Sequence, residues 1–181
     1  LKSNSIAIFN ANDEFPRSGD QSHIFKQNAD LFYLSGIDQE QTILLLFPDC
    51  PNPLYKEVLF LRQTNEHIAV WEGHKYTKEE ARIASGIEYI YWLEEFWNIL
   101  PIIIHYADTI YLNTNENDRF AHGVPYRDLR FIKDIKEKYP LHQYERAALI
   151  LRDLRAVKSH SEIELIKQAC NITRDAFIKV L

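Results

Sequence analysis

The side chains that could bind a metal ion or act as a nucleophile are plentiful in this 181-residue chain, but their spacing forms no self-contained catalytic motif. Its seven histidines are scattered, and none has a partner four residues away to make the helical pair that chelates zinc. The two cysteines have neither CxxC nor Cys/His spacing, so we expect reduced thiols in a cytoplasmic protein. The residues concerned are Cys50, Cys170, His23, His67, His74, His105, His122, His142 and His160.

Other signatures of catalysis are also missing from the sequence. It contains no HExxH, GxSxG, P-loop or GxGxxG motif. We therefore expect no catalytic residue and no metal ligand set within this chain. Most carboxylates fall on the expected solvent-facing sides of helices, where they are hydrated charges, as for Glu79, Glu80, Glu94 and Glu95.

Composition places the chain among soluble globular domains. Hydrophobic residues make up 46% and charged residues 26%, and the length suffices for one ordinary domain with a sizeable core. The net charge of -5 argues against nucleic acid or an anionic membrane as a partner, since both attract clustered Lys and Arg. The longest apolar runs, residues 42–47 and 99–104, are too short to cross a bilayer.

Strand and helix patterns alternate along most of the chain. Short apolar runs between turn formers predict strands, and capping boxes or helical periodicity predict helices. Asp13–Gln21 is expected to be a polar loop, and the runs on either side of Pro51 are expected to form antiparallel neighbours. The alternation predicts an α/β domain with a mixed β-sheet flanked by helices. The expected strands cover residues 6–9, 42–47, 57–61, 89–91 and 109–112, and the expected helices cover residues 77–85, 93–104 and 126–138.

A last helix is expected to begin after Ser159, which has the spacing of a capping box with Glu162, and to continue to Leu181. Two apolar faces lie side by side on it, and a helix that is apolar over so much of its circumference needs cover on both sides. One alternative packs it on the chain's own sheet. The preferred alternative places its partner downstream of Leu181, in a part that is missing. The lack of any methionine also suggests a trimmed piece.

The residues from Gln27 to Ile37 carry the most unusual pattern in the chain. They read Gln-Asn-Ala-Asp-Leu-Phe-Tyr-Leu-Ser-Gly-Ile, so polar side chains run directly into aromatic ones and then into a glycine turn. This segment resembles the N-terminal domain of the aminopeptidase P, prolidase and creatinase family, with Lys26 where the family usually has arginine. Arg62 followed by Trp71-Glu72-Gly73 resembles the family's Arg…Trp-x-Gly segment.

A third motif lies near the C-terminus. Residues 151–163 resemble the family's Arg-x-x-Lys-Ser/Thr-x-x-Glu-Ile phrase, which opens the first helix of the catalytic "pita-bread" domain. The resemblance implies a ribonuclease H-like accessory domain over residues 1–155. Residues 156–181 would then be the linker and first helix of an absent metallopeptidase domain. Among family members, the phrases around Gly36 and Trp71 look most like aminopeptidase P.

The resemblance implies a specific function for the full-length protein. It would be an Xaa-Pro aminopeptidase, which releases the first residue of peptides whose second residue is proline. The Xaa-Pro bond has no N–H and a fixed φ, so a site that binds extended peptides by backbone pairing cannot hold it. Two metal ions, usually manganese, would activate the attacking water, with all their ligands beyond Leu181. The implied partners are the protein's own C-terminal catalytic domain, proline-containing peptides and, in a homo-oligomer, further copies of the chain.

Carried over by position, the resemblance places two residues near a substrate. Asp20 matches an acidic residue near the substrate's amino end, and Trp71 matches an aromatic residue that lines a neighbouring subunit's cleft. A carboxylate suits a peptide ammonium, and an indole offers a large rigid apolar wall. Alternatively, Asp20 orders the turn after Gly19, and Trp71 is a core residue or an oligomer contact. Phe32 and Tyr33 are expected in the core, and the motif residues expected to be structural are Arg17, Gln27, Asn28, Asp30, Tyr33, Gly36 and Arg62.

Two other functions stay open at this point. A prolidase or a creatinase would keep the enzyme but change its substrate, to dipeptides or creatine. The chain cannot distinguish them, because the pocket that sets substrate length spans both domains. A non-catalytic module that binds peptides or histones would lack the metal ligands downstream of Leu181.

Overall fold

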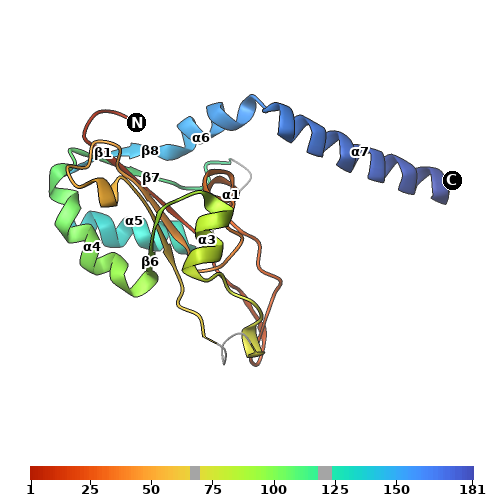
Figure 1. Ribbon diagram of the computed structural model, residues 1–181, viewed down its shortest axis with the longest axis horizontal. Coiled ribbons are helices and arrows are strands. Elements are labelled where there is room, and N and C mark those ends of the chain that lie inside the picture. Colours follow the sequence, from red (N-terminus) through yellow and green to blue (C-terminus); the bar gives the residue numbers. More distant parts are fainter. Residues whose placement is uncertain (66–69, 118–123) are drawn as a thin grey trace. The chain divides into compact units, whose positions relative to one another are not determined.

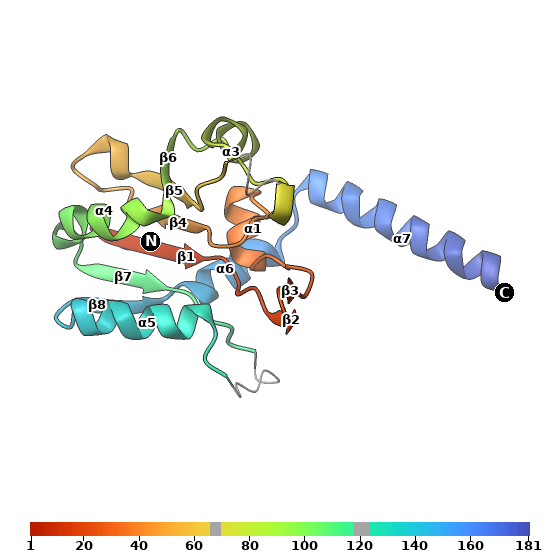
Figure 2. The same ribbon diagram turned by 90° about the horizontal axis from the view of Figure 1, so that it is seen from below.

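The computed structural model describes residues 1–65, 70–117 and 124–181 of the chain. These residues form two compact units, Leu1–Ala148 and Leu149–Leu181. Within the described part of the first unit, six strands make one sheet in the order β6-β5-β4-β1-β7-β8 (Figure 1, and in face view Figure 2). Their bounds are β1 Ser5–Asn10, β4 Ile43–Leu46, β5 Glu57–Leu61, β6 Tyr89–Trp92, β7 Thr109–Leu112 and β8 Gln143–Arg146.

The sheet contains both strand directions. β4 is antiparallel to both of its neighbours, β1 and β5, whereas β1–β7, β5–β6 and β7–β8 are parallel pairs. Ile43 lies opposite Asn10 in one ladder and opposite Phe60 in the other. The predictions of a mixed α/β sheet and of antiparallel strands around Pro51 are therefore confirmed.

The helices begin and end where their local sequences favour it. α3 begins with the predicted capping box, in which Thr77 and Glu80 satisfy each other's free amides, and it ends at Gly86, whose φ is 73°. The expected helix over residues 93–104 is present as α4, which contains Pro101, between two short 3-10 turns. The bounds are α1 Ala29–Ser35, η1 Pro53–Tyr55, α3 Lys78–Ser85, η2 Leu93–Glu95, α4 Phe96–Ile103, η3 Ile104–Tyr106, α5 Arg127–Lys138 and α6 Ala147–Ala156.

Both faces of the sheet are buried, which explains why its central strands are continuous apolar runs. Ile6 and Ile8 of β1 belong to a core formed with α4 and α5. Ala7 and Phe9 alternate with them and are also buried, but they lie outside that core cluster. Figure 1 shows α1 and α3 on the side of the sheet opposite α4 and α5.

Some elements escaped the sequence patterns. The prediction of a loop over Asp13–Gln21 is wrong, because this region contains a two-stranded hairpin, β2 (Pro16–Ser18) and β3 (Gln21–Ser22). α1, β8 and α6 have no counterpart among the predicted elements. β8 is an edge strand with the sequence Gln-Tyr-Glu-Arg, and such polarity suits an edge but conceals a strand from a search for apolar runs.

The second unit is dominated by α7, which spans His160–Val180 and begins at the predicted capping box. Ser159 Oγ accepts a hydrogen bond from the Glu162 amide at 3.3 Å, and Glu162 Oε2 accepts one from the Ser159 amide at 2.8 Å. Apolar side chains on α7, Ile172 and Phe177 among them, are exposed. Among the described residues, no helix has the length and apolar character needed to span a membrane.

Candidate functional site

Asp20 lies in the turn that joins β2 to β3, in a short exposed hairpin. Gly19, just before it, has a φ of 58°, a conformation that residues with a side chain rarely adopt. The His23 amide donates to the Phe15 carbonyl at 2.9 Å and extends the pairing beyond the two strands. The hairpin therefore presents an exposed carboxylate, and Arg17 is exposed on β2.

Asn28 and Gly36 define the two ends of α1. The Asn28 side chain accepts hydrogen bonds from the amides of Asp30 and Leu31, at 2.9 and 3.3 Å. Gly36 ends the helix with a φ of 68°, and a Cβ there would lie 3.4 Å from the carbonyl oxygen of Ala84. Both residues of the motif therefore act on the local fold.

Gln27 connects the start of the motif to its end. Its Nε2 donates to the carbonyl oxygens of Ile37 at 3.1 Å and Gln39 at 2.7 Å. Its Oε1 accepts a hydrogen bond from the Asn28 amide at 2.8 Å. The first two bonds connect Gln27, which precedes α1, to residues that follow the helix, and the third orders the start of the helix. We call residues 27–39, held together in this way, the frame.

The aromatic residues of the motif lie on the outside of the domain. Phe32 is 49% exposed and Tyr33 is 40% exposed, so the expectation that both belong to the core is wrong. The reason is that this segment is helical. Leu31 and Ser35 lie four residues apart on the buried side of α1, and the two aromatic residues between them point elsewhere.

The parallel strands β1 and β7 lie side by side (Figure 2). Asn10 is the last residue of β1 and Asn113 directly follows β7, and each is paired with an aspartate. Asn10 Nδ2 donates to Asp128 Oδ1 at 3.0 Å, and Asn113 Nδ2 donates to Asp30 Oδ2 at 2.9 Å. Asp128 is in the first turn of α5 and Asp30 in the first turn of α1, and these helices cover opposite faces of the sheet (Figure 1). The pairs therefore fasten two helices to the same end of the sheet.

Burial dominates the electrostatics of Asp128, which is 5% exposed. It raises the pKa of the carboxyl from 3.8 to about 7, against the smaller lowering effects of the Asn10 hydrogen bond and of Arg127. Asp30 and Asp13 raise that pKa further. Among the described residues, the buried Asn10 Oδ1 has no hydrogen-bond partner. A proton on Asp128 would give the carboxyl a donor for an amide oxygen, so this pair suits a neutral acid.

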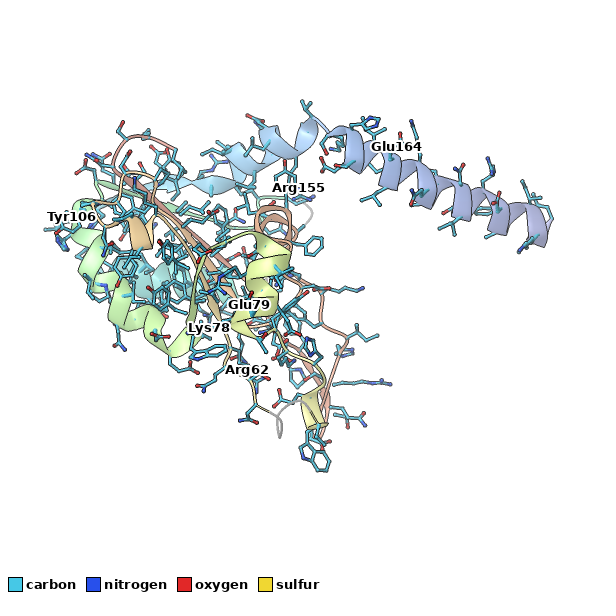
Figure 3. All side chains as sticks on the ribbon, viewed as in Figure 1. Arg62, Lys78, Glu79, Tyr106, Arg155 and Glu164 are labelled. Carbon is cyan, nitrogen blue, oxygen red and sulfur yellow. The ribbon has the colours of Figure 1, made fainter. Side chains whose placement is uncertain are left out.

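Trp71 lies in the segment between β5 and α3 and is 77% exposed, which excludes the alternative of a core residue. Arg62 directly follows β5 (Figure 3). Its Nη1 and Nη2 bind the two carboxylate oxygens of Glu72 at 2.5 and 2.9 Å. Nη1 also lies 3.3 Å from Glu40 Oε1. Glu72, the chain neighbour of Trp71, therefore belongs to a charged network that extends through Arg62 to Glu40, which directly follows the frame around α1.

Sequence reasoning did not single out Glu40, Lys75, Asn10 or Asp128. For Asp128 a signal existed, because its spacing to the apolar positions 131 and 135 places it on the buried side of the expected helix. Asn10 also directly follows the apolar run of residues 6–9 and is the last residue of β1. Glu40 and Lys75 lie in irregular segments with no periodicity, so their burial depends on tertiary contacts alone.

Metal-binding groups are not gathered in the part of the chain that the structure describes. Within residues 1–65, 70–117 and 124–181, no three His, Cys, Asp or Glu side chains are arranged to hold a metal ion. His67 and His122 lie outside the described residues. The thiols of Cys50 and Cys170 are free, the first buried and the second exposed. What the described residues offer is an exposed carboxylate at Asp20 and an exposed indole at Trp71.

Residues 1–111 match the family model of the aminopeptidase P N-terminal domain. The match covers more than half of the chain, so the chain belongs to this family. It is also similar to the Xaa-Pro aminopeptidase of Haemophilus influenzae, with 25% identity over 181 residues. That similarity covers 100% of this chain and 39% of the relative.

Solved structures show the same fold. A candidate aminopeptidase P from Bacillus anthracis has a TM-score of 0.86 and 27% identity, covering 98% of this chain and 42% of that one. A zinc-substituted aminopeptidase P from E. coli, in complex with product, has a TM-score of 0.77 and 20% identity, covering 98% and 40%. The predicted family and fold are confirmed, and the chain spans about two-fifths of the length of these relatives.

Proposed function

We propose that this chain is the N-terminal accessory and oligomerisation domain of a metal-dependent Xaa-Pro aminopeptidase, which releases the first residue of peptides with proline in second position. The family match over residues 1–111 carries the proposal. The similarity to a Haemophilus influenzae Xaa-Pro aminopeptidase supports the activity, and coverage of 39% of that protein supports an accessory role. In this proposal residues 156–181 are the linker and first helix of the catalytic domain.

Asp20 and Trp71 are the groups through which this domain would meet a peptide. An exposed carboxylate on a hairpin can bind the free ammonium of a substrate by a charge-assisted hydrogen bond. An exposed indole offers an apolar wall to a proline ring, which lacks the N–H that backbone pairing would use. The domain would therefore bind and orient the substrate and leave bond cleavage to the other domain.

The metal ions are assigned to the remainder of the full-length protein. The described residues of this chain do not fit a dinuclear site, since they contain no suitable group of ligands. The zinc-substituted E. coli relative supports a metal-dependent enzyme, and manganese is the metal that we expect here. We place the enzyme in the cytoplasm, which agrees with the free thiols of Cys50 and Cys170.

Assays of the chain and of the full-length protein that contains it test this function. With manganese, the full-length protein should release the first residue from an Xaa-Pro tripeptide, and the chain alone should not. Activity of the chain alone would show that catalysis does not lie downstream. Cleavage of dipeptides only would indicate a prolidase, and creatine hydrolysis a creatinase. Peptide or histone binding without any cleavage would indicate the non-catalytic module.

Variants of the full-length protein test the two binding residues. Asp20→Asn should raise KM roughly tenfold or more, the cost of one hydrogen bond to a charged group. The same substitution should have no effect on binding of an N-acetylated peptide, which lacks the ammonium. Trp71→Ala should also raise KM. Asp38→Asn and Ile83→Ala are matched controls, because Asp38 is exposed and Ile83 is 76% exposed against 77% for Trp71.

A further inference from the structure

We propose that Glu40 and Arg62 are positioning residues. Together with Lys75 and Glu72 they form an ion network that fixes residues 70–76, the segment that carries Trp71. The indole is thereby presented to a partner outside this domain. This inference rests on the proposed function, in which the exposed indole meets a peptide substrate.

Glu40 is the buried centre of the network. Its side chain is 6% exposed, and its Oε1 lies 2.5 Å from Lys75 Nζ and 3.3 Å from Arg62 Nη1. The Lys75 side chain is itself only 10% exposed. A buried carboxylate is strongly destabilised unless cations pair with it. Burial of Glu40 is therefore favoured by both cations, Arg62 before Trp71 in the chain and Lys75 after it.

Arg62 extends the network to the residue beside Trp71. Its guanidinium binds both carboxylate oxygens of Glu72, at 2.5 and 2.9 Å, in the fork geometry that fixes direction as well as distance. The hydrogen bonds raise the pKa of Arg62 and lower the pKa of Glu72, so both groups stay charged near neutral pH. Because Glu72 adjoins Trp71 in the chain, holding it restricts the backbone that carries the indole.

A hydrogen bond from a backbone amide to a side chain holds the end of the same segment. The Tyr76 amide donates to Gln39 Oε1 at 2.6 Å, and Gln39 is the neighbour of Glu40. The Gln39 carbonyl accepts from Gln27 Nε2 at 2.7 Å and from Thr42 Oγ1 at 2.9 Å. Residues 72–76 are thus tied to Gln39, Glu40 and Arg62 through Glu72, Lys75 and the Tyr76 amide.

Neither the exposed indole nor the ion network that holds its segment contributes much to the stability of the domain. Trp71 and its neighbour Val70 are each 77% exposed, and exposed apolar surface adds little to hydrophobic stabilisation. Burying a carboxylate beside two cations also gives little net stability, because desolvation offsets the attraction. What the network does supply is order. An aromatic residue that is fixed beforehand loses less entropy on binding, which favours a contact with a partner.

Hydrogen exchange on the full-length protein tests the positioning directly. Glu40→Gln and Arg62→Ala should each raise exchange of the described amides of residues 70–76 roughly tenfold, while exchange in β1 stays unchanged. Arg82→Ala is the matched control, because Arg82 pairs with Glu79 and Glu88 outside the network. Unchanged exchange in both network variants would overturn the proposal.

A second variant keeps the test usable if Glu40→Gln does not fold. The double variant Glu40→Gln with Lys75→Met removes the carboxylate and the ammonium together, so no buried amine is left without its partner. It should fold and still raise exchange over residues 70–76. Circular dichroism confirms the fold before exchange is measured. A folded double variant with native exchange would contradict the positioning role.

Kinetics with an Xaa-Pro tripeptide show whether the position of Trp71 matters to the reaction. Arg62→Lys keeps the charge but loses the fork, and we expect KM to rise roughly tenfold with little change in kcat. The effect should vanish in a Trp71→Ala background, since both changes act through the same contact. A native KM for Trp71→Ala would refute the role in the reaction. A wild-type protein inactive on every Xaa-Pro peptide would refute the proposed function instead, and hydrogen exchange would still decide the positioning.

Discussion

Glu40 and Asp128 are both buried carboxylates, but the domain stabilises them in different ways. Glu40 has two cations close to one oxygen, Lys75 at 2.5 Å and Arg62 at 3.3 Å. Asp128 accepts an amide N–H from Asn10 at 3.0 Å, and burial raises its pKa to about 7. The ion-paired Glu40 contacts Lys75, in the segment that carries the exposed Trp71 and whose conformation the network is proposed to fix. Asp128 instead joins helix α5 to strand β1, and a protonated, neutral carboxyl can make that hydrogen bond without a cation beside it.

The pH dependence of stability is the strongest test of this comparison. The pKa of Asp128 is raised from 3.8 to about 7 in the folded chain, so the folded state binds a proton that the unfolded state releases. Its contribution to stability is fully present below about pH 4 and is lost as the pH rises through about 7. The full effect is on the order of 4 kcal/mol. Urea unfolding between pH 4 and pH 8 measures it.

Asp128→Asn should flatten that profile, because an amide does not titrate and fits the same space beside Asn10. The charged groups that act on Asp128 are Arg127, Asp30 and Asp13, and the variant leaves all three in place. The exposed Asp38→Asn serves as the control and should keep the native profile. An unchanged slope in Asp128→Asn would assign the pH dependence to another group.

Loss of the ion-paired carboxylate should have the next largest effect. Glu40→Ala leaves Lys75 and Arg62 without their shared partner, and we expect the free energy of unfolding to fall by about 3 kcal/mol. Chemical denaturation at pH 7 measures the loss. Adding Lys75→Met should recover part of it, because the buried ammonium is then gone. A fall of less than about 1 kcal/mol would place Glu40 with ordinary surface ion pairs.

The sequence could predict five of the six described strands of the main sheet and most of the helices, because these depend on local patterns. The continuous apolar runs of β1, β4 and β7 and the capping boxes at Thr77 and Ser159 are all local signals, and the structure confirms them. The family resemblance added Gln27 and Asn28 around α1, whose hydrogen-bond partners lie at most 12 positions away. The residues of the frame were therefore indicated by the family resemblance, whereas helix α1 within it was not predicted.

The charged and polar contacts could not be predicted in the same way. Glu40 meets Lys75 across 35 positions, and Asn10 meets Asp128 across 118, so no pattern within either segment reveals the partner. For Phe32 and Tyr33, by contrast, a prediction was made and was wrong. Their apolar character suggested the core, but the unrecognised helix α1 turns them outward. The contacts of Glu40 and Asn10 thus depend on the tertiary fold, whereas the exposure of the two aromatic residues follows from a helix that was not predicted.

The two asparagines allow a finer comparison at the end of the sheet. Asn10→Ala removes the donor to a buried carboxyl and should cost about 1–2 kcal/mol, more above pH 7 than below it because the ionised form needs the donor most. It should also move the pH profile upward, since the Asn10 hydrogen bond lowers the pKa of Asp128. Asn113→Ala should cost less, because Asp30 is only partly buried. Equal losses would show that burial of the carboxylate does not set the cost.

An exposed ion pair completes the series with the smallest effect. Arg82 on α3 pairs with Glu79 and Glu88, whose side chains are 70% and 71% exposed. Water and salt screen such pairs, so Arg82→Ala should change the free energy of unfolding by about 0.5 kcal/mol or less. Raising the salt concentration should make even this difference disappear. The same salt should leave much of the Glu40→Ala loss intact, because burial shields the contact between Glu40 and Lys75 from mobile ions. Equal salt sensitivity of the two variants would mean that burial does not shield the contact between Glu40 and Lys75 from mobile ions.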